Sequence, residues 1–98
     1  MADKETEVRT LQLRNSLLTI QTILDPDRVM TILYANEIIE DADMQKIKIN
    51  ATQSEMVQSL IGVLIKKLKI PDAFEIFIDA LIETGQKHIA AEIQTYGK

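Results

Sequence analysis

The segment Ala73–Ile93, AFEIFIDALIETGQKHIAAEI, contains two apolar stretches separated by Thr84-Gly85-Gln86. Apolar residues in the first stretch recur at spacings of three and four, as one buried face of a helix requires. These residues are Phe74, Phe77, Ile78 and Leu81. Gly85 can adopt the left-handed conformation that ends a helix. The segment therefore predicts a helix, a corner, and a short last helix, from Gln86 to about Tyr96, that folds back over the bundle.

Upstream of this segment, the same periodicity predicts four more helices. The first begins between Asp3 and Glu7 and runs to Leu24, with Leu13, Leu17, Ile20 and Leu24 facing inward. The second covers about 26–35 and the third about 41–47. The fourth carries an apolar residue every four positions, which makes it the central helix. Those residues are Met56, Leu60, Leu64 and Leu68. Pro71 breaks this pattern and opens the fifth helix.

Two N-terminal capping sequences mark where the second and the fourth helix start. Asp25 is a good N-cap, and Pro26 suits the first helical position, where no N–H is needed. Thr52-Gln53-Ser54-Glu55 is a capping box, in which the Thr hydroxyl and the Glu carboxylate each satisfy an unpaired N–H.

Composition agrees with one small all-α domain. The chain has 98 residues, of which 46% are hydrophobic and 27% charged, a globular balance. Three Gly and two Pro are too few for an all-β chain of many short strands. We therefore predict one domain over 1–98, with a core at about 8–96, folded as a six-helix antiparallel bundle.

The residue types give little support for a catalytic site, a metal site or a cofactor site. There is no Cys and a single His, His88, so neither a nucleophile–base set nor a metal-ligand cluster is indicated. The three Gly are scattered and form no phosphate-binding loop. We expect no enzyme and no cofactor, and a surface or packing role for His88.

Location and nucleic-acid binding are judged from hydropathy and charge. No apolar run approaches the roughly 20 residues that span a bilayer, and the polar start MADKETEVRT is not a secretory signal. A cytoplasmic protein is expected. The net charge of −4 argues against nucleic acid as the main partner.

The segments described above resemble caspase recruitment domains (CARDs), members of the death-fold superfamily. The resemblance at the corner is carried by Ala73-Phe74, Phe77, Ala80-Leu81, Thr84-Gly85-Gln86 and His88-Ile89-Ala90. In the middle of the chain it is carried by Ile38-Ile39, Asp43, Ile47, the capping Thr52 and Val57. It covers about 8–93. One departure is Lys69-Ile70-Pro71, where CARDs usually have a basic residue followed by Gly, so this loop is expected to be stiffer.

Charge is unevenly distributed along the chain. Between Asp25 and Asp43 six acidic residues stand against Arg28 alone, a net charge of −5. On residue type alone, such a cluster is usually a solvated face. The resemblance adds a second interpretation. In CARDs an acidic face on the second and third helices meets a basic face on the first and fourth helices of another copy, and head-to-tail repetition gives helical assemblies.

This resemblance implies two sets of binding residues. The acidic set is Asp27, Glu37, Glu40, Asp41 and Asp43. The basic set is Arg9, Arg14, Lys66 and Lys67. The basic half departs from the family, because the start of the fourth helix carries no positive residue. We therefore predict homotypic binding of a basic CARD in apoptotic or inflammatory signalling, with self-assembly into filaments that is weaker or uses a shifted interface.

Two alternatives remain beside this prediction. A free-standing CARD with only one good face would act as a decoy that terminates and inhibits an assembly. A small helical nucleic-acid-binding domain is the remoter alternative, since no basic stripe is present.

Overall fold

The computed structural model describes residues 4–95, and all the regular structure in this range is helical. The helices are α1 (Lys4–Ile20), α2 (Pro26–Ala35), α3 (Asp41–Lys48), α4 (Gln53–Lys66), α5 (Ala73–Glu83) and α6 (Lys87–Thr95). Their order and approximate positions are those predicted from the sequence. The predicted end of the last helix, Tyr96, lies outside the described residues.

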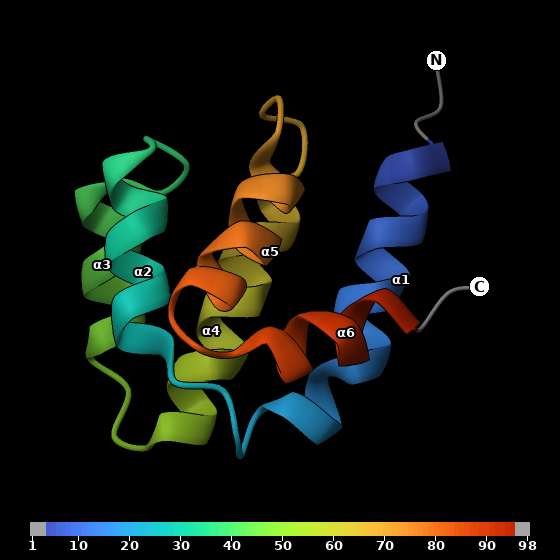
Figure 1. Ribbon diagram of the computed structural model, residues 1–98. Helices are drawn as coiled ribbons and strands as arrows, with labels where there is room; N and C mark the ends of the chain where they lie inside the picture. The colour runs from blue at the N-terminus through green and yellow to red at the C-terminus, as the bar shows by residue number, and fades with distance from the viewer. Residues whose placement is uncertain (1–3, 96–98) are drawn as a thin grey trace.

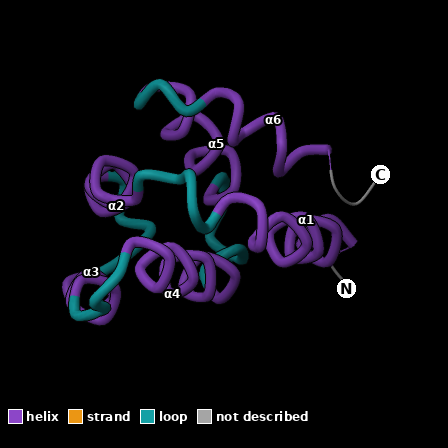
Figure 2. Tube along the Cα trace, turned by 90° about the horizontal axis from the view of Figure 1, so that it is seen from below, coloured by secondary structure: helices purple, strands orange, loops and turns teal. Residues whose placement is uncertain are grey.

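The helices form a bundle with two distinct edges (Figure 1). α2 and α3 lie together at one edge, α1 lies at the opposite edge, and α4 and α5 fill the middle. α6 crosses from the end of α5 to pack on α1, and α1 also packs on α4. The view along the helices in Figure 2 shows the same order, with α1 and α3 far apart. The acidic set, on α2 and α3, and the two arginines of α1 therefore lie at opposite edges of the molecule.

One apolar core joins all six helices, and it contains nearly every residue that the periodicity predicted to face inward. The fully covered side chains include Leu13, Leu33, Leu60, Phe77 and Ile93. Leu17 and Met56 are only partly buried at its margin. Burial of this apolar area is the main force that holds six helices of 8 to 17 residues together.

The predicted caps and the predicted corner are confirmed. The Asp25 carboxylate accepts the Asp27 N–H at 3.2 Å, and the Thr52 hydroxyl accepts the Glu55 N–H at 3.1 Å. Gly85 has φ +80° and lies just after α5. The N–H of Gly85 donates to the Ile82 carbonyl and that of Gln86 to the Leu81 carbonyl. This pair of bonds is a Schellman motif, for which Gly is the favoured residue.

Two predicted helix bounds were wrong. α1 ends at Ile20 rather than Leu24, and the chain turns through 21–23. Side chains from later in the chain hold the residues just after that turn, because Gln53 Nε2 donates to the Leu24 carbonyl at 2.6 Å and Gln86 Oε1 accepts the Asp25 N–H at 2.7 Å. Those contacts are made between distant parts of the chain, so local periodicity does not contain them.

The fifth helix was predicted to open at Pro71, but α5 begins at Ala73. Asp72 has φ +66°, a left-handed conformation that no α-helical residue adopts. The loop between α4 and α5 therefore ends in a reversal of the backbone at Asp72, and Pro71 belongs to the preceding turn.

Candidate protein-interaction surface

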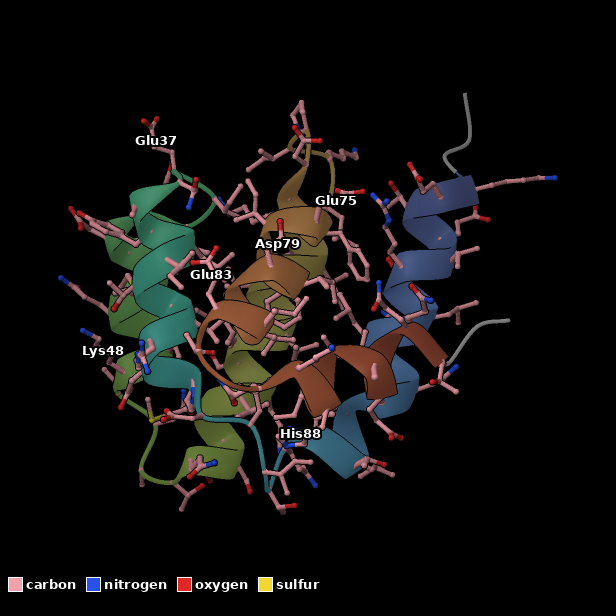
Figure 3. The ribbon with its side chains drawn as sticks, in the orientation of Figure 1. Glu37, Lys48, Glu75, Asp79, Glu83 and His88 are labelled. Carbon is pink, nitrogen blue, oxygen red and sulfur yellow. The ribbon has the colours of Figure 1, made fainter. Side chains whose placement is uncertain are left out.

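The acidic set lies on α2, α3 and the turn between them. Asp27 is in the first turn of α2, whereas the other four residues lie between the end of α2 and the first turn of α3. Because the ten residues of α2 span roughly 15 Å, Asp27 is separated from the rest by the length of that helix. In Figure 3, Glu37 marks one end of the α2–α3 pair and Lys48, the last residue of α3, lies toward the other. Thus the structure gathers four of the five predicted carboxylates.

Three of these four carboxylates, Glu37, Glu40 and Asp41, line a shallow open cavity of about 520 Å³, here called the acidic hollow. Its lining is Tyr34, Ala35, Glu37, Ile39, Glu40 and Asp41. The Tyr34 hydroxyl donates to Asp41 Oδ1 at 2.6 Å, and this hydrogen bond raises the pKa of the Tyr34 phenol above its ordinary value. The hollow therefore combines three exposed carboxylates with one aromatic ring.

Glu37 is held by the backbone in an unfavourable conformation. Its φ is +61°, and it occupies the position after α2 that Gly85 occupies after α5. The N–H of Glu37 donates to the Tyr34 carbonyl and that of Ile38 to the Leu33 carbonyl, so the same Schellman motif ends α2. A side chain in this region costs about 1 kcal/mol relative to Gly.

Asp43 differs from the other members of the acidic set. One of its oxygens accepts the Glu40 N–H at 3.0 Å, within a capping box that starts α3. The same carboxylate lies 3.4 Å from Lys67 Nζ, and both side chains are mostly covered, with 20% and 26% of their area exposed. The Asp43 carboxylate is therefore already bound by groups of the same chain, and it links α3 to the end of α4.

Arg9, a member of the basic set, is also held within the chain. Its guanidinium pairs with Glu5 Oε2 at 3.1 Å and with Glu75 of α5, and it lies 4.9 Å from the centre of the Phe74 ring. Only 21% of its side chain is exposed. These contacts fasten α1 to α5 and leave little of the charge for a partner.

The four residues of the basic set do not form one surface. Arg14 and Lys66 are exposed, and neither pairs with another residue in the described range 4–95. Lys66 is the last residue of α4, and α4 ends at the same end of the bundle where α1 begins (Figure 1). Arg14 lies two to three turns further along α1. The two exposed cations are therefore at different levels of the bundle.

Sequence reasoning missed two charged or aromatic features. Glu75, Asp79 and Glu83 are exposed and follow one another every four residues along α5, where Figure 3 shows them in a row. This spacing is visible in the sequence, although the apolar residues of the same helix give the stronger signal. The sequence also gives no signal for Tyr34, which is exposed and whose partner Asp41 belongs to the next helix.

A protein-family model of the caspase recruitment domain matches residues 9–96, which is nearly the whole chain. This chain belongs to the CARD family. The six helices of the described range agree with the death-fold bundle that this family adopts. Searches of curated proteins and of solved structures returned no significant match.

Membership gives the general role of the chain. A CARD is a protein-interaction domain that binds other CARD-containing proteins in apoptotic and inflammatory signalling. Over residues 4–95 no three His, Asp or Glu side chains are arranged so that they could hold a metal ion. None of the helices described is both long and apolar enough to cross a bilayer. His88 is exposed at the start of α6, away from the acidic hollow (Figure 3).

Proposed function

We propose that this CARD recruits, or is recruited by, a second CARD that presents a basic surface, and that the acidic set is the binding site. The acidic hollow is the observation that carries this proposal. It offers three exposed carboxylates around an open cavity of about 520 Å³, which is room for a long side chain. We place the resulting assembly in the cytoplasm, in apoptotic or inflammatory signalling.

An Arg side chain of the partner fits the chemistry of this hollow. A guanidinium forms paired hydrogen bonds to carboxylates, and it also stacks on aromatic rings. Glu37, Glu40 and Asp41 supply the carboxylates, and Tyr34 supplies the ring. Because Tyr34 already holds Asp41 by a hydrogen bond, this carboxylate loses less freedom when a partner binds.

The conformation of Glu37 supports the same site. A glycine at this position would relieve the left-handed strain, as Gly85 does after α5. Strained residues tend to persist where they serve a function, since elsewhere the simpler residue would stabilise the fold. A carboxylate retained at such a position favours binding of a cation there.

Charge reversal tests the proposal. Asp27→Lys combined with Asp41→Lys places two cations at the two ends of the acidic set and should weaken binding of a basic CARD by roughly a hundredfold or more. The matched control is Asp79→Lys with Glu83→Lys, which makes the same change of charge on exposed residues of α5. Isothermal titration calorimetry at low and physiological salt measures both variants. Equal loss in the two variants would show that net charge alone, and not this site, governs binding.

A decoy that ends an assembly is a second candidate. It is favoured by the asymmetry between the two sets, because a head-to-tail assembly needs both faces on every copy. The two roles differ when a small amount of this chain is added to a basic CARD that forms filaments. A nucleator shortens the lag of assembly, whereas a decoy lengthens it and reduces the final light scattering.

A further inference from the structure

The outer face of α1 exposes apolar side chains that the bundle does not cover. Val8, Leu11 and Leu18 have 41%, 50% and 81% of their area exposed. α1 packs on α4 and α6, and Figure 2 shows its other side facing away from the bundle. A shallow cavity of about 360 Å³ adjoins Leu11 on this side. The acidic set lies at the opposite edge, so its function does not account for these residues.

These residues follow the spacing of a helix–helix contact. Val8, Leu11, Asn15 and Leu18 are separated by three, four and three residues, which is the a and d pattern of a two-helix interface. Glu7 and Arg14 lie on one side of this row of a and d residues, each just before an a position, and both are exposed. Neither forms an ion pair with another residue of the described range. The α1 line, defined as Glu7, Val8, Leu11 and Arg14, thus carries apolar residues and both signs of charge.

We infer that the α1 line docks against the same line of a second copy, as an antiparallel pair of α1 helices. A two-fold axis between Val8 and Leu11 places Val8 of each copy opposite Leu11 of the other. The same axis brings Glu7 of each copy near Arg14 of the other, because residues at matching flanking positions meet in an antiparallel pair. The surface is therefore complementary to itself in both shape and charge.

Charge selects this register over its neighbours. A register shifted by one heptad would cover Leu18, but it would place Arg14 of one copy against Arg14 of the other. A parallel pair would also cover Leu18. In that pair, however, neither Glu7 nor Arg14 would face a residue of opposite charge on the other copy. The antiparallel register centred between Val8 and Leu11 is the one that satisfies both charges, and it leaves Leu18 outside the contact.

Such a dimer closes on itself, whereas the head-to-tail contact of CARDs does not. It would also cover Arg14, one of the two exposed members of the basic set. The contact buries less area than a standard interface, which buries about 800 Å² per partner. The dimer is therefore weak and forms at high protein concentration. The inference does not rest on the proposed function, since it uses no residue of the acidic set.

Sedimentation equilibrium over a wide range of concentrations tests the contact in the Asp27→Lys/Asp41→Lys background, which removes the proposed head-to-tail contact. The background protein should show a monomer–dimer equilibrium. Leu11→Ser should raise its dissociation constant about tenfold or more, because both copies lose a buried leucine. Leu18→Ser is the matched control, since it makes the same change at the most exposed leucine of the same helix and should alter the constant less than about twofold. Circular dichroism checks that each variant folds.

A charge swap gives the second test. Glu7→Arg and Arg14→Glu should each weaken the dimer, and the two together should restore it, because the pair is re-formed with its signs exchanged. A chain that stays monomeric at millimolar concentration overturns the inference. So does a swap without restoration, or an effect of Leu18→Ser as large as that of Leu11→Ser.

Discussion

The acidic set leaves four of its five residues exposed, whereas the basic set has two of its four residues paired within the chain. Glu37, Glu40 and Asp41 surround a cavity that is open to solvent. Arg9 instead joins α1 to α5, and Lys67 joins α4 to α3. A count of charges along the sequence treated these residues as equivalent. The difference shows that charge available to a partner is what remains after the bundle has formed its own ion pairs.

The largest expected effect on stability separates the two arginines of α1. Arg9→Ala should lower the free energy of unfolding by about 1–2 kcal/mol, because it removes an ion pair with Glu75 and the contact with the Phe74 ring. Arg14→Ala should change it by less than about 0.5 kcal/mol, as for other exposed residues. Urea denaturation followed by circular dichroism measures both. Equal stabilities would mean that Arg9 is as available as Arg14, and the comparison above would fail.

Glu37 tests the cost of keeping a carboxylate in the acidic hollow. Glu37→Gly should raise the free energy of unfolding by about 0.5–1 kcal/mol, because Gly adopts φ near +60° without the clash of a Cβ atom. Glu37→Ala is the matched control, since it removes the same carboxylate and keeps the clash, and it should leave stability nearly unchanged. Both variants should weaken binding of a basic CARD equally. A stability gain in Glu37→Ala as large as in Glu37→Gly would locate the cost in the charge rather than in the backbone.

Local signals account for the parts of the fold that were predicted correctly. Asp25, Thr52 and Gly85 act through residues within a few positions of themselves, so their roles are visible in the sequence. The end of α1 depends on Gln53 and Gln86, which lie 29 and 61 residues from the backbone groups they bind. Glu37 gave no signal either, because a helix that ends without Gly has no local mark of its left-handed residue.

The candidate site could be predicted only in part, for a similar reason. The acidic set was recognisable because its residues are close in sequence and carry one sign of charge. The partners of Arg9 and Lys67 come from other helices, so their pairing appears only after the bundle is packed. Sequence gives the inventory of charges on a small helical domain, whereas packing decides which of them are left for binding.

The pair between Asp43 and Lys67 should have a smaller effect. A double-mutant cycle with Asp43→Asn and Lys67→Met is expected to give a coupling energy of about 0.5 kcal/mol, because the two groups are 3.4 Å apart and partly open to solvent. Thermal or urea unfolding provides the four free energies. Lys66→Met in place of Lys67→Met is the control and should show no coupling to Asp43, since Lys66 is exposed. Coupling of equal size to both lysines would indicate a long-range electrostatic effect rather than a specific ion pair between Asp43 and Lys67.

The smallest expected effect concerns protonation of Tyr34 in the acidic hollow. The hydrogen bond to Asp41 favours the neutral phenol, so the pKa of Tyr34 lies above its ordinary value of 10.0. Asp41→Asn should move that pKa back toward the ordinary value, because the amide accepts the hydrogen bond without the negative charge. Absorbance of the tyrosinate measures it in a Tyr96→Phe background, which leaves one tyrosine.

The direction of the stability effect follows from the raised pKa of Tyr34. The folded state holds this proton more tightly than the unfolded state, so its stabilising contribution is present below about pH 10 and is lost as the pH rises through the folded pKa. Binding of a cationic partner in the acidic hollow should lower the pKa of Tyr34, since a nearby positive charge favours the phenolate. A basic CARD that binds tightly without changing this titration would occupy some other surface. The titration therefore locates the partner at Tyr34 and Asp41 independently of any loss of affinity.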